Sequence, residues 1–71
     1  MDSKDWEAVG QMQMSLGDFI LTNGGNPGPT YAAAEDAFYQ AKELTQEGTT
    51  EHERLKALQI KAQMSGRGRR R

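Results

Sequence analysis

His52 has the neighbours that come closest to a catalytic or metal-binding motif, and it is the single histidine of the chain. The run His52-Glu53-Arg54-Leu55-Lys56 begins like the zinc-protease pattern, which places two histidines four residues apart on one face of a helix. Lys56 stands where the second histidine is needed, so a metal ion would lack a pair of ligands on adjacent turns. We therefore expect an exposed histidine near a helix start, with no metal and no cofactor bound.

Nucleophiles and neighbouring carboxylates elsewhere in the chain show no catalytic arrangement. A serine nucleophile needs a base and a group that orients the base, and the three serines would have to share one histidine. Glu35 and Asp36 are adjacent, so on a helix their side chains point about 100° apart. Both features predict a protein that is not an enzyme.

The C-terminal end is the segment with the most definite chemical character. Residues 1–66 hold five basic and ten acidic side chains, a net charge of −5, and residues 67–71 add four arginines. Arginine binds phosphate through two parallel hydrogen bonds. We expect non-specific contacts with nucleic-acid phosphates at five basic residues, namely Arg67, Arg69, Arg70, Arg71 and Lys61. Two alternatives stay open: the tail docks on an acidic protein surface, or it has no specific partner.

Three segments of helical periodicity must position these groups, and the first covers about residues 3–21. An Asp or Ser at its start can cap the helix, and its apolar residues fall within an arc of roughly 140° at 100° per residue. This stripe, expected to face the core, consists of Trp6, Val9, Met12, Leu16, Phe19 and Ile20. Gly10 and Gly17 lie one heptad apart, which indicates either a close approach of another helix or a locally weakened helix.

A loop rich in glycine and proline, residues 22–30, separates the first helix from the second. The second helix is expected from Thr30, as its N-terminal cap, to about Glu47, with Gly48 as its stop signal. Its inward stripe contains Tyr31, Ala34, Ala37, Phe38, Ala41 and Leu44. Tyr39 points away from that stripe, so we expect it to cover another element or a partner.

The third helix starts with the clearest local signal in the chain, a capping box formed by Thr50 and Glu53. We expect it to end near residues 64–65 with Gly66 as its cap, and a linker of about three residues predicts an antiparallel hairpin with the second helix. Leu55, Leu58 and Ala62 share one face. The nearly opposite face is also apolar and has no evident partner within the chain. Together with Tyr39 it forms the expected interface, whose other residues are Ala57, Ile60 and Met64.

Composition limits the chain to one thin domain. Leu, Ile, Val and Phe account for ten of the 71 residues, and cysteine is absent, so a small core has neither disulfides nor a cysteine-bound zinc to stabilise it. No apolar run approaches the roughly 18–20 residues of a membrane span. We expect an all-α, three-helix domain over residues 1–66, with a flexible, disordered, Arg-rich tail over residues 67–71. The N-terminus lacks a signal-peptide layout, which favours a cytoplasmic protein, or a virion protein if phage-encoded.

These features predict a non-enzymatic assembly or accessory protein of bacterial or phage type. It would be homo-oligomeric, with a basic tail that contacts nucleic acid and without any membrane contact. The alternative is a protein–protein interaction module or inhibitor that docks through its helices. A third hypothesis is an oligomer that sequesters a small anionic ligand.

Overall fold

The computed structural model describes residues 2–67, which form three α-helices. These are α1 (Ser3–Thr22), α2 (Gly28–Glu43) and α3 (Thr50–Arg67). The helices account for 82% of the described residues, which contain no strand. The expected all-α, three-helix fold is therefore confirmed. The expected disordered tail falls mainly on residues 68–71, which lie outside the described residues.

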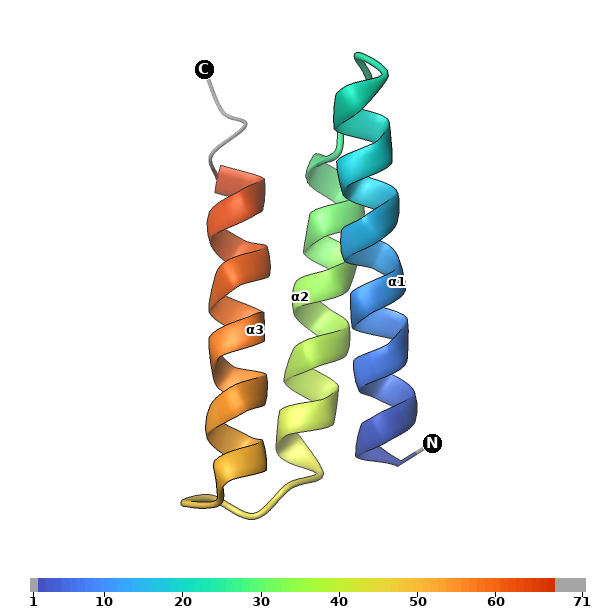
Figure 1. Cartoon of the computed structure of the whole chain (residues 1–71). Helices are drawn as coiled ribbons and strands as arrows, with labels where there is room; N and C mark the ends of the chain where they lie inside the picture. The colour runs from blue at the N-terminus through green and yellow to red at the C-terminus, as the bar shows by residue number, and fades with distance from the viewer. Residues whose placement is uncertain (1, 68–71) are drawn as a thin grey trace.

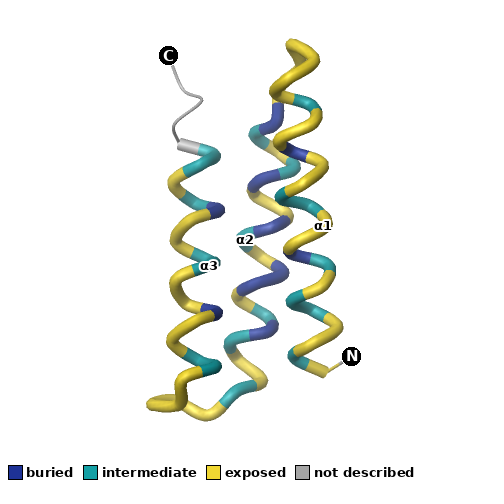
Figure 2. Tube along the Cα trace, in the orientation of Figure 1, coloured by how far each residue is buried: buried dark blue, intermediate teal, exposed yellow. Residues whose placement is uncertain are grey.

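Helix α2 lies between the other two helices and runs antiparallel to both, so α1 and α3 point in the same direction (Figure 1). The expected antiparallel hairpin of the second and third helices is thus observed. The buried positions concentrate along α2, as the dark blue segments of Figure 2 show. The Cα trace is flattened, with principal extents of 38 × 22 × 14 Å.

Local signals explain both ends of α1. The Asp2 carboxylate accepts a hydrogen bond from the Asp5 backbone N–H at 3.0 Å, which caps the first turn. At the other end Gly24 has a φ of +84°, a conformation that glycine adopts without strain. The Gly25 N–H then bonds back to the Ile20 carbonyl at 2.9 Å.

The inward face of α1 is not the one expected from its large apolar residues. Gly10 and Gly17 are its buried positions, while Met12, Leu16 and Phe19 are 64%, 47% and 65% exposed. The prediction that these three side chains face the core is therefore wrong. The other three members of the stripe, Trp6, Val9 and Ile20, are half-buried, and Met14, which lies off the stripe, packs against the core.

Two aromatic rings of α2 explain this rotation of α1. A methyl group added at Gly10 would lie 2.5 Å from Cε1 of Phe38, and one added at Gly17 would lie 2.6 Å from Cε1 of Tyr31. No real Cβ atom tolerates such contacts, so each ring occupies the space above a glycine. Of the two interpretations of the glycine pair, close approach of a helix is the one observed.

Helix α2 is shifted by a few residues from its expected bounds. It begins at Gly28 after Pro27 and has no side-chain cap, so Thr30 lies inside the helix rather than capping it. It ends at Glu43, which leaves residues 44–49 as a loop that is longer than expected. Gly48, with a φ of +90°, lies within this loop. The predicted stripe is buried along the helix proper, but Leu44 follows the helix and is exposed.

The cap of α3 is Thr49, one residue before the predicted capping box. Its hydroxyl accepts a hydrogen bond from the His52 N–H at 3.1 Å and donates one to the Gln46 carbonyl at 2.7 Å. The His52 ring is half-buried rather than exposed, with Nδ1 3.0 Å from the Thr45 hydroxyl. The helix continues through Gly66 to Arg67, so Gly66 does not end it.

The core is small and dominated by alanine. Its buried hydrophobic residues within the described chain are Tyr31, Ala34, Ala37, Phe38, Ala41, Leu55 and Ala62. Trp6, Met14 and Leu58 pack against it at the edges. The expected inward face of α3 is thereby confirmed. Because only three large side chains of the described chain are buried, Tyr31, Phe38 and Leu55, many of its large apolar side chains face solvent.

Candidate interaction surfaces

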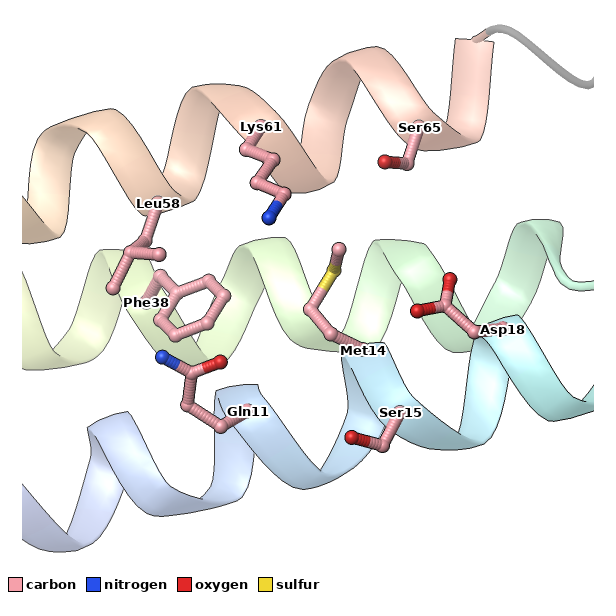
Figure 3. Close-up of a pocket in the computed structure, with 8 residues that line it drawn as sticks. All are labelled: Gln11, Met14, Ser15, Asp18, Phe38, Leu58, Lys61 and Ser65. Carbon is pink, nitrogen blue, oxygen red and sulfur yellow. The ribbon is translucent and has the colours of Figure 1, made fainter.

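A groove lies between α1 and α3, with α2 as its floor (Figure 3). Its volume is about 190 Å³, which is space for a few water molecules or a small ligand. Phe38, Met14 and Leu58 supply its apolar lining, and its polar lining consists of Gln11, Ser15, Asp18, Lys61 and Ser65. In Figure 3 the Lys61 side chain extends from α3 into the space between the helices.

Both signs of charge meet in this groove. The Asp18 carboxylate accepts a hydrogen bond from the Tyr31 hydroxyl at 2.6 Å, so the carboxylate is held on the α1 side. The Lys61 ammonium approaches from α3. A small anion attracted by Lys61 would also meet the Asp18 carboxylate, which weakens the case for anion sequestration at this place.

Polar contacts between α1 and α3 link the helices at the end of the molecule where both begin. The Arg54 guanidinium forms a two-bond ion pair with the Glu7 carboxylate, the longer bond joining Nη2 to Oε1 at 3.1 Å. This pairing raises the pKa of Arg54 above its ordinary value. The Ser3 hydroxyl donates to Glu51 at 3.4 Å nearby. Since the Arg54 side chain is 48% exposed, the pair orients the helices more than it stabilises them.

The interface residues predicted on α3 all lie at the surface. Ala57, Ile60 and Met64 are exposed on the side of α3 that faces away from the core. Glu53 and Arg67 continue the same line of positions at steps of three and four residues, so charged residues stand at both ends of this apolar patch. The expected apolar face therefore exists, and it is exposed in the described chain.

Tyr39, the fourth predicted interface residue, is exposed on α2. The Lys42 ammonium lies 5.2 Å from the centroid of its ring, a cation–π distance. The ring is thus partly covered by a neighbour on its own helix. Its remaining surface stays open to a partner.

The basic residues predicted to contact phosphate are only partly described. Arg67 is the last residue of α3. Arg69, Arg70 and Arg71 lie outside the described residues. Lys61 is exposed, but it extends into the groove between α1 and α3 instead of continuing the basic end of the chain.

The outward side of α1 is a surface that the sequence analysis missed. Its apolar residues stand at alternating steps of three and four, the spacing of coiled-coil core positions. We call this line the outer seam, and it consists of Val9, Met12, Leu16 and Phe19. Between Ala8 and Thr22 the helix has one charged residue, Asp18, which bonds Tyr31 on another side. The outer seam is therefore an uncharged apolar line over about three turns.

A signal for this second line was present in the sequence. Gly10 and Gly17 recur at the same heptad spacing on a neighbouring side of the helix, so α1 has two lines at coiled-coil spacing. Side-chain size alone predicted that the line of large apolar residues faces the core, whereas the glycine line does. The rings at Tyr31 and Phe38, themselves one heptad apart, were the clue that a partner helix could fill the glycine positions.

Within residues 2–67, no three acidic or histidine side chains gather closely enough to hold a metal ion. The described helices include none that is both long enough and apolar enough to cross a membrane. Comparison with protein-family models, with curated proteins and with solved structures finds no match to this chain.

Proposed function

We propose that this protein is a non-enzymatic assembly protein that associates with itself through its exposed helix faces. In this proposal the arginines at the end of α3 contact nucleic-acid phosphates without reading sequence. The observation that carries the proposal is the distribution of large apolar side chains. Among the described residues three of them are buried in the core, whereas eight are exposed.

An excess of exposed over buried large apolar side chains is more typical of a subunit of an assembly than of an independent monomer. Exposed apolar residues that stand alone are normal, but contiguous lines of them mark contact surfaces. Ile60 and Met64 make such a line on α3. Burial of a large apolar side chain contributes roughly 1.5–3 kcal/mol, so association would add stability that the small core lacks.

Light scattering or sedimentation at micromolar concentration tests self-association directly. The native chain should be larger than a monomer, and Ile60→Lys should shift it toward the monomer because a charge would be buried in the contact. Lys56→Glu is the matched control, since it changes an exposed residue of the same helix without removing apolar surface. A well-folded native monomer at these concentrations would contradict the proposal.

Nucleic-acid contact is supported by the charge distribution of the chain. Four arginines follow a body whose net charge over residues 1–66 is −5, so phosphates would be attracted at that end and repelled elsewhere. A few arginines on one chain bind weakly. Several chain ends on one assembly would raise the effective concentration of arginines and with it the affinity.

The salt dependence of binding tests this second part. Four phosphate contacts on duplex DNA give a log–log slope of affinity against salt of about −3 to −4. Changing Arg67, Arg69, Arg70 and Arg71 together to Gln should abolish binding in low salt while the helix content stays the same. Equal binding by both proteins would show that the tail is not the contact. Docking of the helices onto a different protein then becomes the leading function.

A further inference from the structure

We infer that the outer seam of α1 binds the same seam of a second copy, with the two α1 helices antiparallel. The inference rests on the proposed self-association and names a surface and a geometry for it. The first observation is exposure at heptad spacing: Met12, Leu16 and Phe19 are the exposed large residues, and Val9, one step before them, is half-buried. Steps of three and four along a helix are the repeat that pairs with another helix.

The α1 helix is already used in this way on its other side. Gly10 and Gly17 receive the rings of Phe38 and Tyr31, which come from α2. The outer seam repeats the heptad spacing of that contact on a neighbouring side of the helix, but with large side chains in place of glycine. A helix with two such lines can pack between two partner helices. Within the described chain, α2 packs against the glycine line, and no helix packs against the outer seam.

The outer seam complements itself when the helices run antiparallel. In antiparallel pairs the two kinds of core position face each other, which places Met12 against Leu16 of the second copy and Val9 against its Phe19. Every apolar residue of the seam then meets an apolar residue. The pairing is a two-fold contact centred near residue 14, which closes into a dimer instead of growing into a fibre.

The residues at the two ends of the seam favour the same direction. Asp5 and Asn23 are the next positions in the repeat, and antiparallel pairing sets the carboxylate of one copy against the amide of the other. The Asn23 amide donates to the Phe19 carbonyl at 2.8 Å, which uses one of its two hydrogens. Parallel pairing would instead oppose Asp5 with Asp5, two like charges.

The position of the basic C-terminal sequence also favours antiparallel over parallel pairing. Because α1 and α3 point the same way, Arg67, the last residue of α3, lies at the end of the molecule where α1 finishes. A parallel pair would bring the C-terminal ends of both α3 helices, where the basic part of the sequence begins, to one end of the dimer. An antiparallel pair places these two helix ends at opposite ends of the dimer, separated by about the 30 Å length of a 20-residue helix.

Cysteine cross-linking in the full chain tests the surface and the direction together, because the natural sequence has no cysteine. Met12→Cys and Leu16→Cys are made as separate proteins, mixed in equal amounts and oxidised, and the products are identified by mass. Antiparallel pairing predicts that the mixed disulfide dominates. It should form on the order of a hundredfold faster than dimers of Ala33→Cys, an exposed control on α2, because paired thiols meet at high effective concentration.

Each other outcome overturns the inference in a distinct way. If Met12→Cys cross-links chiefly to itself, the helices are parallel. If neither α1 cysteine forms dimers faster than the Ala33 control while light scattering still reports an oligomer, self-association stands and uses a different surface. If the native chain is a monomer and no cross-links form, both the proposed self-association and this contact fail. Circular dichroism of each variant confirms that the exposed substitutions leave the helices intact.

Discussion

The two contacts that α2 makes are built in opposite ways. Toward α1, α2 supplies the large residues, and the rings of Tyr31 and Phe38 fill space above two glycines. Toward α3, α2 supplies mainly small residues: Ala34 and Ala41 join Phe38 in the buried cluster that contains Leu55. One helix thus combines protruding rings with small positions, which lets both neighbours approach it closely.

The two contacts also differ in whether their polar atoms find hydrogen-bond partners. The α1–α2 contact brings apolar rings against backbone, and the Tyr31 hydroxyl reaches Asp18. The α3 side includes Gln59, whose Oε1 atom is buried without a hydrogen-bond partner among the described residues. The α1–α2 contact is therefore sensitive to added volume, while the contact with α3 can gain from the loss of a polar group.

Removal of the Phe38 ring, which takes part in both contacts, should change the free energy of unfolding most. Phe38 is fully buried in the core cluster and also covers Gly10. Phe38→Ala should lower the free energy of unfolding by about 3–5 kcal/mol, because it leaves a cavity between three helices. Urea denaturation at fixed protein concentration measures the change. Tyr39→Ala, on the exposed side of the same helix, should lose no more than about 1 kcal/mol.

Added volume at the glycines tests the α1–α2 contact alone. Gly10→Ala or Gly17→Ala should lower the free energy of unfolding by about 1–2 kcal/mol, since overpacking against a ring outweighs the better helix propensity of alanine. Thermal denaturation followed by circular dichroism provides the measurement. Ser15→Ala, at an exposed position of α1 in the groove, is the control and should stabilise slightly. Stabilisation by both glycine substitutions would mean that the rings do not occupy those positions.

Replacement of the unpartnered amide tests the contact with α3. Gln59→Met keeps a long side chain and removes the buried oxygen, so the free energy of unfolding should rise by about 1 kcal/mol. Gln63→Met on the same helix is a matched control, because its side chain is also half-buried, and its effect should be close to zero. A loss of stability in Gln59→Met alone would show that the Gln59 carbonyl is bonded in solution.

The ion pair of Arg54 with Glu7, between α3 and α1, should contribute least to the free energy of unfolding. Arg54→Ala should lower the free energy of unfolding by at most about 1 kcal/mol, because the Arg54 side chain is about half exposed, and the difference should shrink in high salt. The raised pKa of Arg54 means that its contribution is present below the ordinary arginine pKa and is lost only as pH rises through the higher folded value. Thermal denaturation from about pH 7 to 10 should therefore show a constant difference between the two proteins.

Local sequence signals determined where the helices lie and which faces of two of them point inward. Asp2 and Gly24 mark the ends of α1 by capping chemistry that does not depend on the rest of the fold. The inward stripes of α2 and α3 follow from single apolar lines. Cap positions were less predictable, since Pro27 and Thr49 took places expected for later threonines. Neighbouring residues can cap a helix almost equally well.

The interaction surfaces were predicted only in part. The exposed apolar patch of Ile60 and Met64 was expected, because α3 has two opposite apolar faces and the chain offers a partner for one of them. The outer seam of α1 was not expected. Its large side chains are what a core normally selects, so hydrophobicity alone assigned Leu16 and Phe19 to the interior.

Tertiary packing alone decided which side of α1 faces the core. The sequence determined that α1 is a helix with two lines at heptad spacing, one containing glycines and the other large apolar residues. Nothing local distinguishes the two lines, because α1 is the same regular α-helix whichever line faces inward. The choice depends on the shape of α2, whose rings at Tyr31 and Phe38 need the space that Gly10 and Gly17 leave open. Complementary volume between helices outweighed the burial of the larger side chains, which is why they remain at the surface.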